Sequence, residues 1–451
     1  MELIILTIFS IVFAVLSWRH MNLALGFLIL ALPTYLFRFQ VLGIPMTLLE
    51  LMIGIIIVVF FVKRAQVSFT KKQPFDASTS SAQAKLRVTQ TVKGLVGGLT
   101  FSNYKWLMVA IFFVATLAIV FSSDKLAALG IWKAYFVEPM LLFIVIINTV
   151  KTKEDFKLLI NFLGLSALLI SSVAIYQKFS GQFIPNEIWA AEETRRVTSL
   201  FGYPNAVGLF LAPVVVLFAG RLVTRKLKFA RPLDWCGLKS AMFELVVVGS
   251  GAMAIWFARS EGAVVAVLIG LLFLGLLIKR LRIITLSLMV VGVLLFAFVP
   301  SVQDLVITKA TLSDFSGNIR VIIWQESLQM LSDNPLWGAG LSGFQNVIAD
   351  YHHSAHIFEI YLYPHNIVLN FWSELGILGL VFFIFLIFKF FYNYIKVKKE
   401  NGEFYLVLMA VMVAILVHGI VDVPYFKNDL SVLWWVFFAI SAILIKRKAI
   451  A

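Results

Sequence analysis

The sequence is poor in two kinds of residue that soluble and secreted domains use heavily. Only 14% of its 451 residues are charged, against about 25% in soluble domains, and Cys236 is its single cysteine. One cysteine cannot form an intrachain disulfide, so a disulfide scaffold is excluded. Hydrophobic residues make up 61% of the chain and the mean hydropathy is +0.94, which excludes disorder and collagen-like repeats. This much apolar surface predicts an all-α integral membrane protein.

Long apolar runs extend along most of the chain. Thirteen of them could cross roughly 30 Å of hydrocarbon as helices, and they lie at 2–17, 22–37, 47–63, 105–122, 127–149, 157–179, 203–219, 241–257, 262–278, 283–300, 366–395, 404–420 and 429–445. We therefore expect one polytopic domain over 1–451 with about 12–13 transmembrane helices. The first run lacks a basic start and a small-residue cleavage site, so we interpret it as a retained helix. Half-insertion of that run would leave twelve crossings.

The net charge indicates orientation. Lys and Arg (38) exceed Asp and Glu (24) by 14, a balance also found in nucleic-acid-binding proteins. If the basic tail at 446–448 is cytoplasmic, the other basic segments fall on the same side of the membrane, as membrane topology favours. They are 389–399, 279–282, 221–239, 151–157, 63–105 and the turn at Arg19. The opposite face is then not basic, which argues against nucleic-acid binding.

Two polar stretches separate the apolar runs. Residues 63–105 have no apolar periodicity in their first half, and we expect a flexible cytoplasmic loop. Residues 301–364 form the expected extracytoplasmic loop. This loop carries an apolar stripe that predicts an amphipathic helix ending before Asp333; the stripe consists of Ile319, Ile322, Ile323 and Leu331. An ordered outer loop between membrane helices is where we expect function.

Four of the six histidines lie within fourteen residues near the end of this loop: His352, His353, His356 and His365. His352 and His356 would share a helix face with Glu359, in ligand types that suit zinc or manganese. The alternative is a solvated loop at the membrane edge, and we expect no metal. His365 precedes Asn366 at the start of an apolar helix, where an imidazole can accept a proton. That position is equally typical of a helix cap.

Arginines on the outer face form the second set of candidates. Arg195 and Arg196 lead into a helix that begins near Asn205, and paired guanidiniums at a helix start suit an anion. They could instead anchor to lipid phosphates. Arg259 and Arg320 are the other outer arginines, and either could form a surface ion pair.

Charged residues inside apolar runs are functional candidates by default. Glu374 lies inside the helix that follows His365, and Lys133 and Glu138 lie close together in another. Mutual pairing explains Lys133 and Glu138 equally well. We interpret Gly376 and Gly379 as small residues that allow close helix packing.

Several motifs together resemble one known family. Arg320-x-x-x-Trp324 is followed by Asn-Pro-Leu-Trp-Gly-Ala-Gly at 334–340, then by His365-Asn366, nine residues, and Gly-x-x-Gly at 376–379. This order resembles the O-antigen ligase and polymerase family, which are polytopic glycosyltransferases of the GT-C type. The run Phe-Gly-x-Pro-Asn-x-x-Gly at 201–208 is similar to a second element of that family. Leu380 and Ser-Glu-Gly at 260–262 depart from the family pattern.

The resemblance implies a GT-C-like bundle with one large extracytoplasmic loop in the bacterial plasma (inner) membrane. It implies metal-independent, inverting transfer of a glycan from undecaprenyl diphosphate to an acceptor hydroxyl at the outer face, without a cofactor. The acceptor could be lipid A-core sugar, another glycan chain or a protein hydroxyl. His365 would be the base. The diphosphate would bind to Arg195, Arg196, Arg259 and Arg320, supported by Asn366, Asn205 and Glu374.

Two other classes compete with this interpretation. A transporter or flippase of a lipid-linked glycan would also be polytopic, but transporters commonly show internal repeats and polar residues at the bilayer midplane. The sequence shows no repeat, and its candidate groups gather at one face. A structural membrane protein would not need arginines and His365 on the same side.

Overall fold

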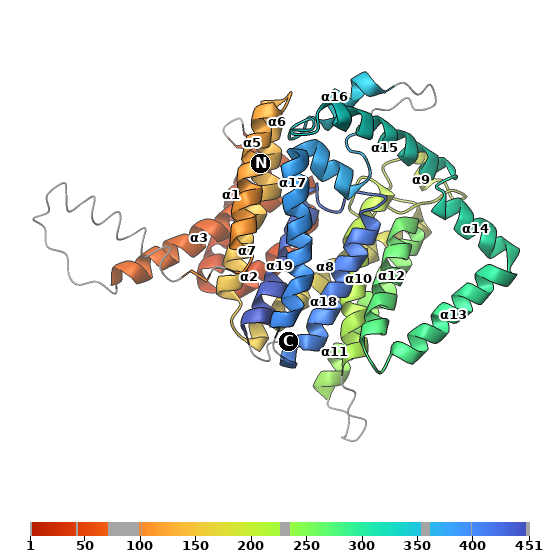
Figure 1. The fold of residues 1–451 in the computed structure, drawn as a ribbon. Coiled ribbons are helices and arrows are strands. Elements are labelled where there is room, and N and C mark those ends of the chain that lie inside the picture. The colour runs from red at the N-terminus through yellow and green to blue at the C-terminus, as the bar shows by residue number, and fades with distance from the viewer. Residues whose placement is uncertain are drawn as a thin grey trace, which may run out of the picture.

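The computed structural model describes residues 2–41, 44–70, 99–100, 102–225, 235–352, 361–397 and 399–447. These residues are mostly helical, which confirms the all-α integral membrane fold (Figure 1). A short hairpin was not expected: β1 (Arg38–Val41) pairs antiparallel with β2 (Ile44–Thr47). Most of the expected cytoplasmic loop lies outside the described residues.

Every apolar run recognised in the sequence falls on a helix or on consecutive helices. The helices are α1 (Glu2–Arg19), α2 (Met21–Leu30), η1 (Leu32–Leu36), α3 (Leu48–Thr70), α5 (Lys105–Phe121), α6 (Lys125–Ile131), η2 (Trp132–Val137), α7 (Glu138–Thr149), α8 (Lys153–Ser180), α9 (Glu187–Ala190), α10 (Pro204–Thr224), α11 (Trp235–Phe257), α12 (Glu261–Leu277), α13 (Arg282–Phe298), α14 (Pro300–Ala310), α15 (Phe315–Asp333), α16 (Phe344–Ile348), η3 (Ala349–Tyr351), α17 (Ile367–Tyr392), η4 (Asn393–Lys396), η5 (Lys399–Asn401), α18 (Gly402–His418) and α19 (Asn428–Lys446).

Fewer helical segments are long enough for a full crossing than there are apolar runs in the sequence. Seven helical segments of the described residues are long and apolar enough to cross a membrane, or eight if the bent pair of Arg282–Phe298 and Pro300–Asp333 is one span. Other runs form shorter helices. The 10 residues of α2 rise only about 15 Å, half of the hydrocarbon thickness. The expected count of 12–13 is therefore not reached by length and composition, because an apolar run does not show where its helix ends.

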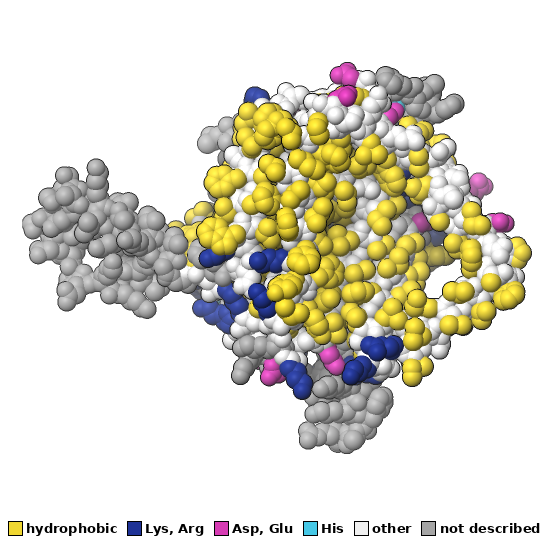
Figure 2. Space-filling view, viewed as in Figure 1, with side chains coloured by type: hydrophobic (Ala, Val, Ile, Leu, Met, Phe, Trp, Pro, Cys, Tyr) yellow, Lys and Arg dark blue, Asp and Glu magenta, His cyan; other side chains and the backbone are white. Residues whose placement is uncertain are grey.

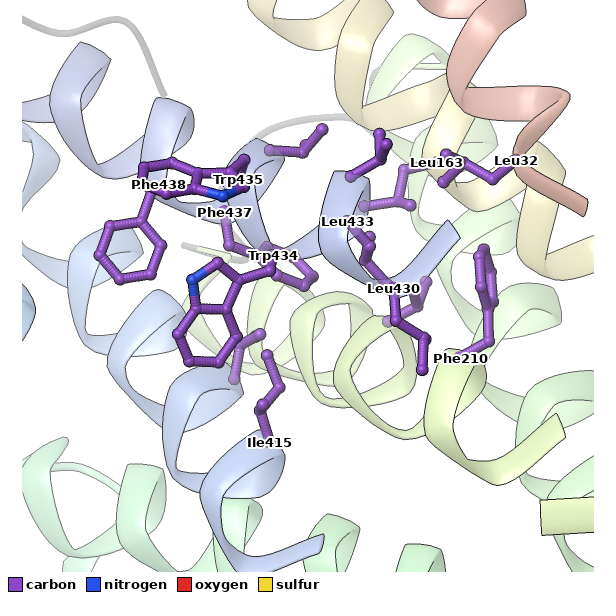
Figure 3. Packing of buried hydrophobic residues seen from close by; sticks show 14 of the residues in the cluster. Leu32, Leu163, Phe210, Ile415, Leu430, Leu433, Trp434, Trp435, Phe437 and Phe438 are labelled. Carbon is purple, nitrogen blue, oxygen red and sulfur yellow. The ribbon is translucent and has the colours of Figure 1, made fainter. Parts of the chain in front are cut away.

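The centre of the bundle is formed by helices that are apolar on all sides. α10 packs against α8, α11, α12 and α18, and α19 packs against α7. Figure 3 shows Trp434, Trp435 and Phe438 of α19 among buried side chains of several other helices. A helix that is hydrophobic all round belongs in the interior. These central helices fix the ends of α10, α17 and α19 and the α18–α19 loop, residues 419–427, beside one another.

The helix expected from the apolar stripe is α15, which ends at Asp333. Its residues Ile323, Met330 and Leu331 are buried in a small core of their own with Phe344 of α16. α15 therefore lies across the end of the bundle, as Figure 1 shows. In the described part of the chain, α13 packs mainly against α12 and α14 and exposes most of its apolar side chains.

The orientation expected from the sequence stays a prediction, and it depends on where the basic side chains lie. Figure 2 shows apolar side chains over the middle of one face, with most of its Lys and Arg toward the end that carries the C-terminus in Figure 1. In a Cys236→Ser background, we expect Ser332→Cys to be labelled in intact cells by a membrane-impermeant thiol reagent. We expect Ser80→Cys, in the 63–105 segment, to react only after permeabilisation. Labelling of Ser80→Cys in intact cells would overturn this topology.

Candidate active site

His365 lies immediately before α17, and the cap of that helix fixes its position. Oδ1 of Asn366 accepts hydrogen bonds from the backbone N–H groups of Val368 and Leu369 at 2.9 and 3.1 Å. Nδ2 of Asn366 donates to the carbonyl of Ile420 at 3.0 Å. The start of α17 is therefore tied to the α18–α19 loop.

The ring of His365 faces a buried carboxylate in that loop. His365 has a left-handed backbone with φ 49°, a strained conformation that non-glycine residues rarely adopt and that often occurs at functional sites. Its Nδ1 lies 3.5 Å from Oδ1 of Asp422, whose side chain is only 3% exposed. Catalytic hydrogen bonds are often longer than normal before substrate binds and then shorten. The structure thus presents a histidine with an acid partner, and the sequence analysis had not selected Asp422.

Asp422 carries a negative charge throughout the neutral pH range. Burial alone would raise the pKa of Asp422, but the rings of His365 and His418 and the N–H of Val423 lower it to about 2. A fixed carboxylate beside an imidazole sets the ring orientation and stabilises the imidazolium that forms when the other ring nitrogen takes a proton.

Two residues of α15 hold the segments on either side of this pair. Nε of Arg320 donates to the carbonyl of Val421 at 2.8 Å, and Nε1 of Trp324 donates to the carbonyl of Pro364 at 2.9 Å. The residues at i and i+4 share one helix face. The Arg-x-x-x-Trp motif therefore positions the neighbour of Asp422 and the neighbour of His365 from a single helix.

Arg196 and Arg259 meet at the turn between α11 and α12. Arg196 donates from Nε to the carbonyl of Ala258 at 3.1 Å. Its NH2 group donates to Oδ1 of Asn205 at 3.2 Å and to the carbonyl of Arg259 at 3.4 Å. NH2 of Arg259 donates to the carbonyl of Glu193 at 3.4 Å. Asn205 thus orients Arg196, whereas Arg259 has a strained backbone with φ 51°.

The positive charge of this group is not neutralised by a direct ion pair. Burial lowers the pKa of Arg196, and the charges of Arg259 and Arg320 lower it further, against an opposing effect of Glu261. Within the described ranges, no carboxylate lies at ion-pair distance from any of the three guanidiniums, and Glu261 pairs with Lys309 at 2.6 Å. Clustered guanidiniums without an ion-pair partner suit a phosphate-bearing ligand. We call Arg196, Arg259 and Arg320 the arginine cluster.

The structure does not bring Arg195 into this cluster. Its Nε donates to the carbonyl of Ala190 at 3.1 Å, and its NH1 donates to the carbonyl of Lys178 at 3.0 Å. Arg195 therefore connects α8 to α9, whereas Arg196 contacts the α11–α12 turn. Of the adjacent pair, the contacts favour Arg196 as the donor ligand, and this assignment stays a prediction.

Glu374 holds a loop in place at a break in α17. Its Oε2 accepts the backbone N–H of Ser342 at 2.5 Å. Gly376 has φ 69° inside the helix, and a Cβ there would lie 2.0 Å from the carbonyl oxygen of Leu336. Gly338 is equally tight against the backbone of α17. The Gly-rich turn at 338–340 and the Gly-x-x-Gly motif at 376–379 therefore pack against each other. Glu374 supports the site indirectly, through this contact.

The intramembrane charges noted in the sequence form a local ion-pair group. Nζ of Lys133 lies 3.9 Å from Glu138 and 3.4 Å from Glu50 of α3. Mutual pairing, the structural alternative, therefore accounts for both residues.

Of the other three loop histidines, His352 is the one that the structure describes. His352 Nδ1 lies 3.1 Å from Oε2 of Glu326, and His353, His356 and Glu359 lie outside the described residues. In the part of the chain that the structure describes, no three His, Cys, Asp or Glu side chains are placed to hold a metal.

We expect chelators to leave glycan transfer unchanged, because the family resemblance noted in the sequence implies a transfer that needs no metal. The measurement is the rate of glycan transfer before and after treatment with EDTA. Inactivation by EDTA followed by recovery with zinc or manganese would contradict this expectation.

Sequence reasoning missed Asp422 and His418. Asp422 is a lone acid at the end of an apolar run, and acids in such positions are functional candidates. Nothing in the sequence indicated that the α18–α19 loop returns to His365.

One comparison with known proteins gives a match. Residues 245–384 match the family model described as O-antigen ligase. The matched segment contains Arg259, Arg320 and His365, whereas Arg196 and Asp422 lie outside it. No curated protein matches the chain.

Proposed function

We propose that this chain, which the match of residues 245–384 places in the O-antigen ligase family, transfers a glycan from undecaprenyl diphosphate to an acceptor hydroxyl. The family match supports a ligase-like role in polysaccharide biosynthesis. The family and the apolar helices together support a multi-pass membrane protein. The observation that carries the finer proposal is the convergence of the arginine cluster and the His365–Asp422 pair on the α18–α19 loop.

The arginine cluster binds the diphosphate of the donor. As the glycosidic bond breaks, negative charge develops on the departing diphosphate, and preorganised guanidiniums stabilise that charge. Binding of the anion also relieves the mutual repulsion among the three arginines. The polyprenyl chain remains in the apolar region beside the bundle.

His365 acts on the acceptor. The acceptor oxygen attacks the anomeric carbon of the donor sugar as the bond from that carbon to the diphosphate oxygen breaks, and the configuration inverts. The acceptor proton passes to the ring nitrogen of His365 that faces away from Asp422, and Asp422 stabilises the resulting imidazolium. In this scheme side chains supply both the base and the positive charge, so the step requires neither a metal nor a nucleotide.

The reaction takes place at the outer face of the bacterial inner membrane. The basic loops assign the opposite end of the bundle to the cytoplasm, and the site lies at the ends of α10, α17 and α19 that face outward in this orientation.

Surface glycans of cells with and without the gene test this function and identify the acceptor. Loss of long chains with single repeats retained indicates polymerisation, and accumulation of lipid-linked polymer indicates ligation. Loss of sugar from a surface protein indicates a protein acceptor. Unchanged glycans and unchanged lipid-linked intermediates would contradict the proposal.

A further inference from the structure

A second polar group lies beside His365 and takes no part in the mechanism described above. Nζ of Lys427, in the α18–α19 loop, lies 4.4 Å from the centre of the Tyr203 ring and 5.4 Å from those of Tyr35 and Phe201. Asp429 follows at the start of α19. We call these five residues the Lys427 cluster. They come from η1, the approach to α10 and the approach to α19, which are distant in the sequence.

The Lys427 cluster is continuous with the base. The hydroxyl of Tyr203 lies 3.2 Å from the hydroxyl of Tyr363, and the Tyr363 ring centre lies 5.0 Å from that of His365. Asp422, the partner of His365, is five residues before Lys427 in the same loop. Burial and the charge of Asp422 raise the pKa of Tyr363 to about 12, so its hydroxyl keeps its proton at neutral pH and can donate it.

Charged groups of the cluster have unused hydrogen-bonding capacity. Among the described residues, Lys427 has no carboxylate at ion-pair distance. Both carboxylate oxygens of Asp429 are buried without a side-chain donor among the described residues. Only the backbone N–H groups of Asp429 and Leu430 lie near them, and the side chain is 1% exposed. Buried polar atoms are nearly always satisfied, so such a group indicates a ligand that brings both donors and acceptors. Aromatic side chains with a few polar groups are typical of a site for a small organic ligand.

The order of contacts puts His365 between the arginine cluster and the Lys427 cluster. The Lys427 cluster therefore lies on the side of His365 away from the donor diphosphate. Arg320 bonds Val421, the next residue Asp422 faces His365, and Tyr363 and Tyr203 lead from His365 to Lys427. In an inverting displacement the nucleophile enters opposite the leaving group. A diphosphate held by the arginine cluster therefore leaves the acceptor to reach the anomeric carbon from the side away from that cluster, where His365 and the Lys427 cluster lie.

We propose that the Lys427 cluster binds the acceptor sugar whose hydroxyl attacks the donor. Lys427 donates to a sugar oxygen, and Asp429 accepts from a sugar hydroxyl. The assignment rests on the proposed function and narrows the acceptor to a carbohydrate.

Lys427→Met tests the assignment because it keeps an unbranched side chain on the aromatic rings and removes only the ammonium. In proteoliposomes with a lipid-linked repeat unit as donor, and core-only lipopolysaccharide or a second repeat unit as acceptor, we expect the acceptor KM to rise on the order of 10-fold. Binding of undecaprenyl diphosphate should stay within about 2-fold of wild type, because that binding needs only the donor side. Tyr203→Phe should show the same pattern more weakly.

Two controls separate the possible outcomes. Lys125→Met removes an exposed lysine, which should change neither parameter, and Arg320→Gln should weaken undecaprenyl diphosphate binding. Weaker binding of undecaprenyl diphosphate by Lys427→Met would assign Lys427 to the donor. An unchanged acceptor KM in folded Lys427→Met protein would show that the cluster has only a packing role. Either result overturns the proposal. Transfer by wild type to a protein hydroxyl but to neither carbohydrate acceptor would overturn this assignment alone, whereas absence of transfer to any acceptor would contradict the proposed function itself.

Discussion

Replacing His365 by alanine should lower glycan transfer by about 10²- to 10⁴-fold, the usual contribution of a positioned base. A sugar hydroxyl is too weakly acidic to attack unaided at neutral pH. His365 is a partly exposed imidazole whose acid partner, Asp422, lies next to the residue that Arg320 bonds. The measurement is the turnover number of purified variant with a lipid-linked donor. Binding of undecaprenyl diphosphate should be unchanged, because the arginine cluster is intact.

His352→Ala is the matched control, since it removes an imidazole that pairs with Glu326 and not with Asp422. The control should retain most of the activity. Transfer near the wild-type rate by folded His365→Ala protein would remove the base from the mechanism.

The pH profile tests the same residue independently. A protonated imidazole cannot accept a proton, so the wild-type rate should fall as the pH drops and the ring becomes charged. Asp422 does not contribute to this fall: its pKa of about 2 lies below the unfolded value, so its charge, and the stability that this charge adds, is present at neutral pH and lost only in strong acid. A rate that stays constant as the medium becomes acidic would contradict the assignment.

Arg196→Ala should reduce turnover on the order of 10²-fold or more, because the variant loses a preorganised cation at the departing diphosphate. Arg196→Lys should recover only part of the rate, since an ammonium cannot form the bidentate contact of a guanidinium. The measurements are turnover and the affinity for undecaprenyl diphosphate, both of which should decline.

Arg195→Ala is the control at the adjacent position. Wild-type Arg195 donates to the carbonyls of Lys178 and Ala190 and lies away from the arginine cluster. Correctly inserted Arg195→Ala protein should keep its turnover. Full activity of Arg196→Ala would exclude the arginine from the mechanism, and a larger loss in Arg195→Ala would show that the assignment of the pair is reversed.

The sequence indicated the helices and the candidate side chains, but it did not indicate which residues those side chains contact. Apolar runs gave the positions of the membrane helices, and the stripe from Ile319 to Leu331 predicted α15, because both signals are local. The short length of α2 and the break between α13 and α14 could not be predicted from hydrophobicity, which does not register where a backbone turns.

Pairings between distant residues were the main information that the sequence lacked. His365 and Asp422 are separated by the whole of α17 and α18, and only the packing of these helices brings the two side chains together. The opposite directions of Arg195 and Arg196 likewise depend on the local backbone. Glu374 was correctly noticed as an unusual buried acid, but its partner, the N–H of Ser342, belongs to the Gly-rich turn.

The central claim is that the protein breaks the bond between glycan and diphosphate. The most direct test supplies purified protein in sealed vesicles with a donor labelled in both the glycan and the polyprenyl chain, together with the acceptor. The account predicts that every glycan joined to acceptor releases one undecaprenyl diphosphate, that the anomeric configuration inverts, and that His365→Ala gives neither product. Movement of the intact doubly labelled donor across the bilayer, with no free undecaprenyl diphosphate, would contradict the account and identify a transporter.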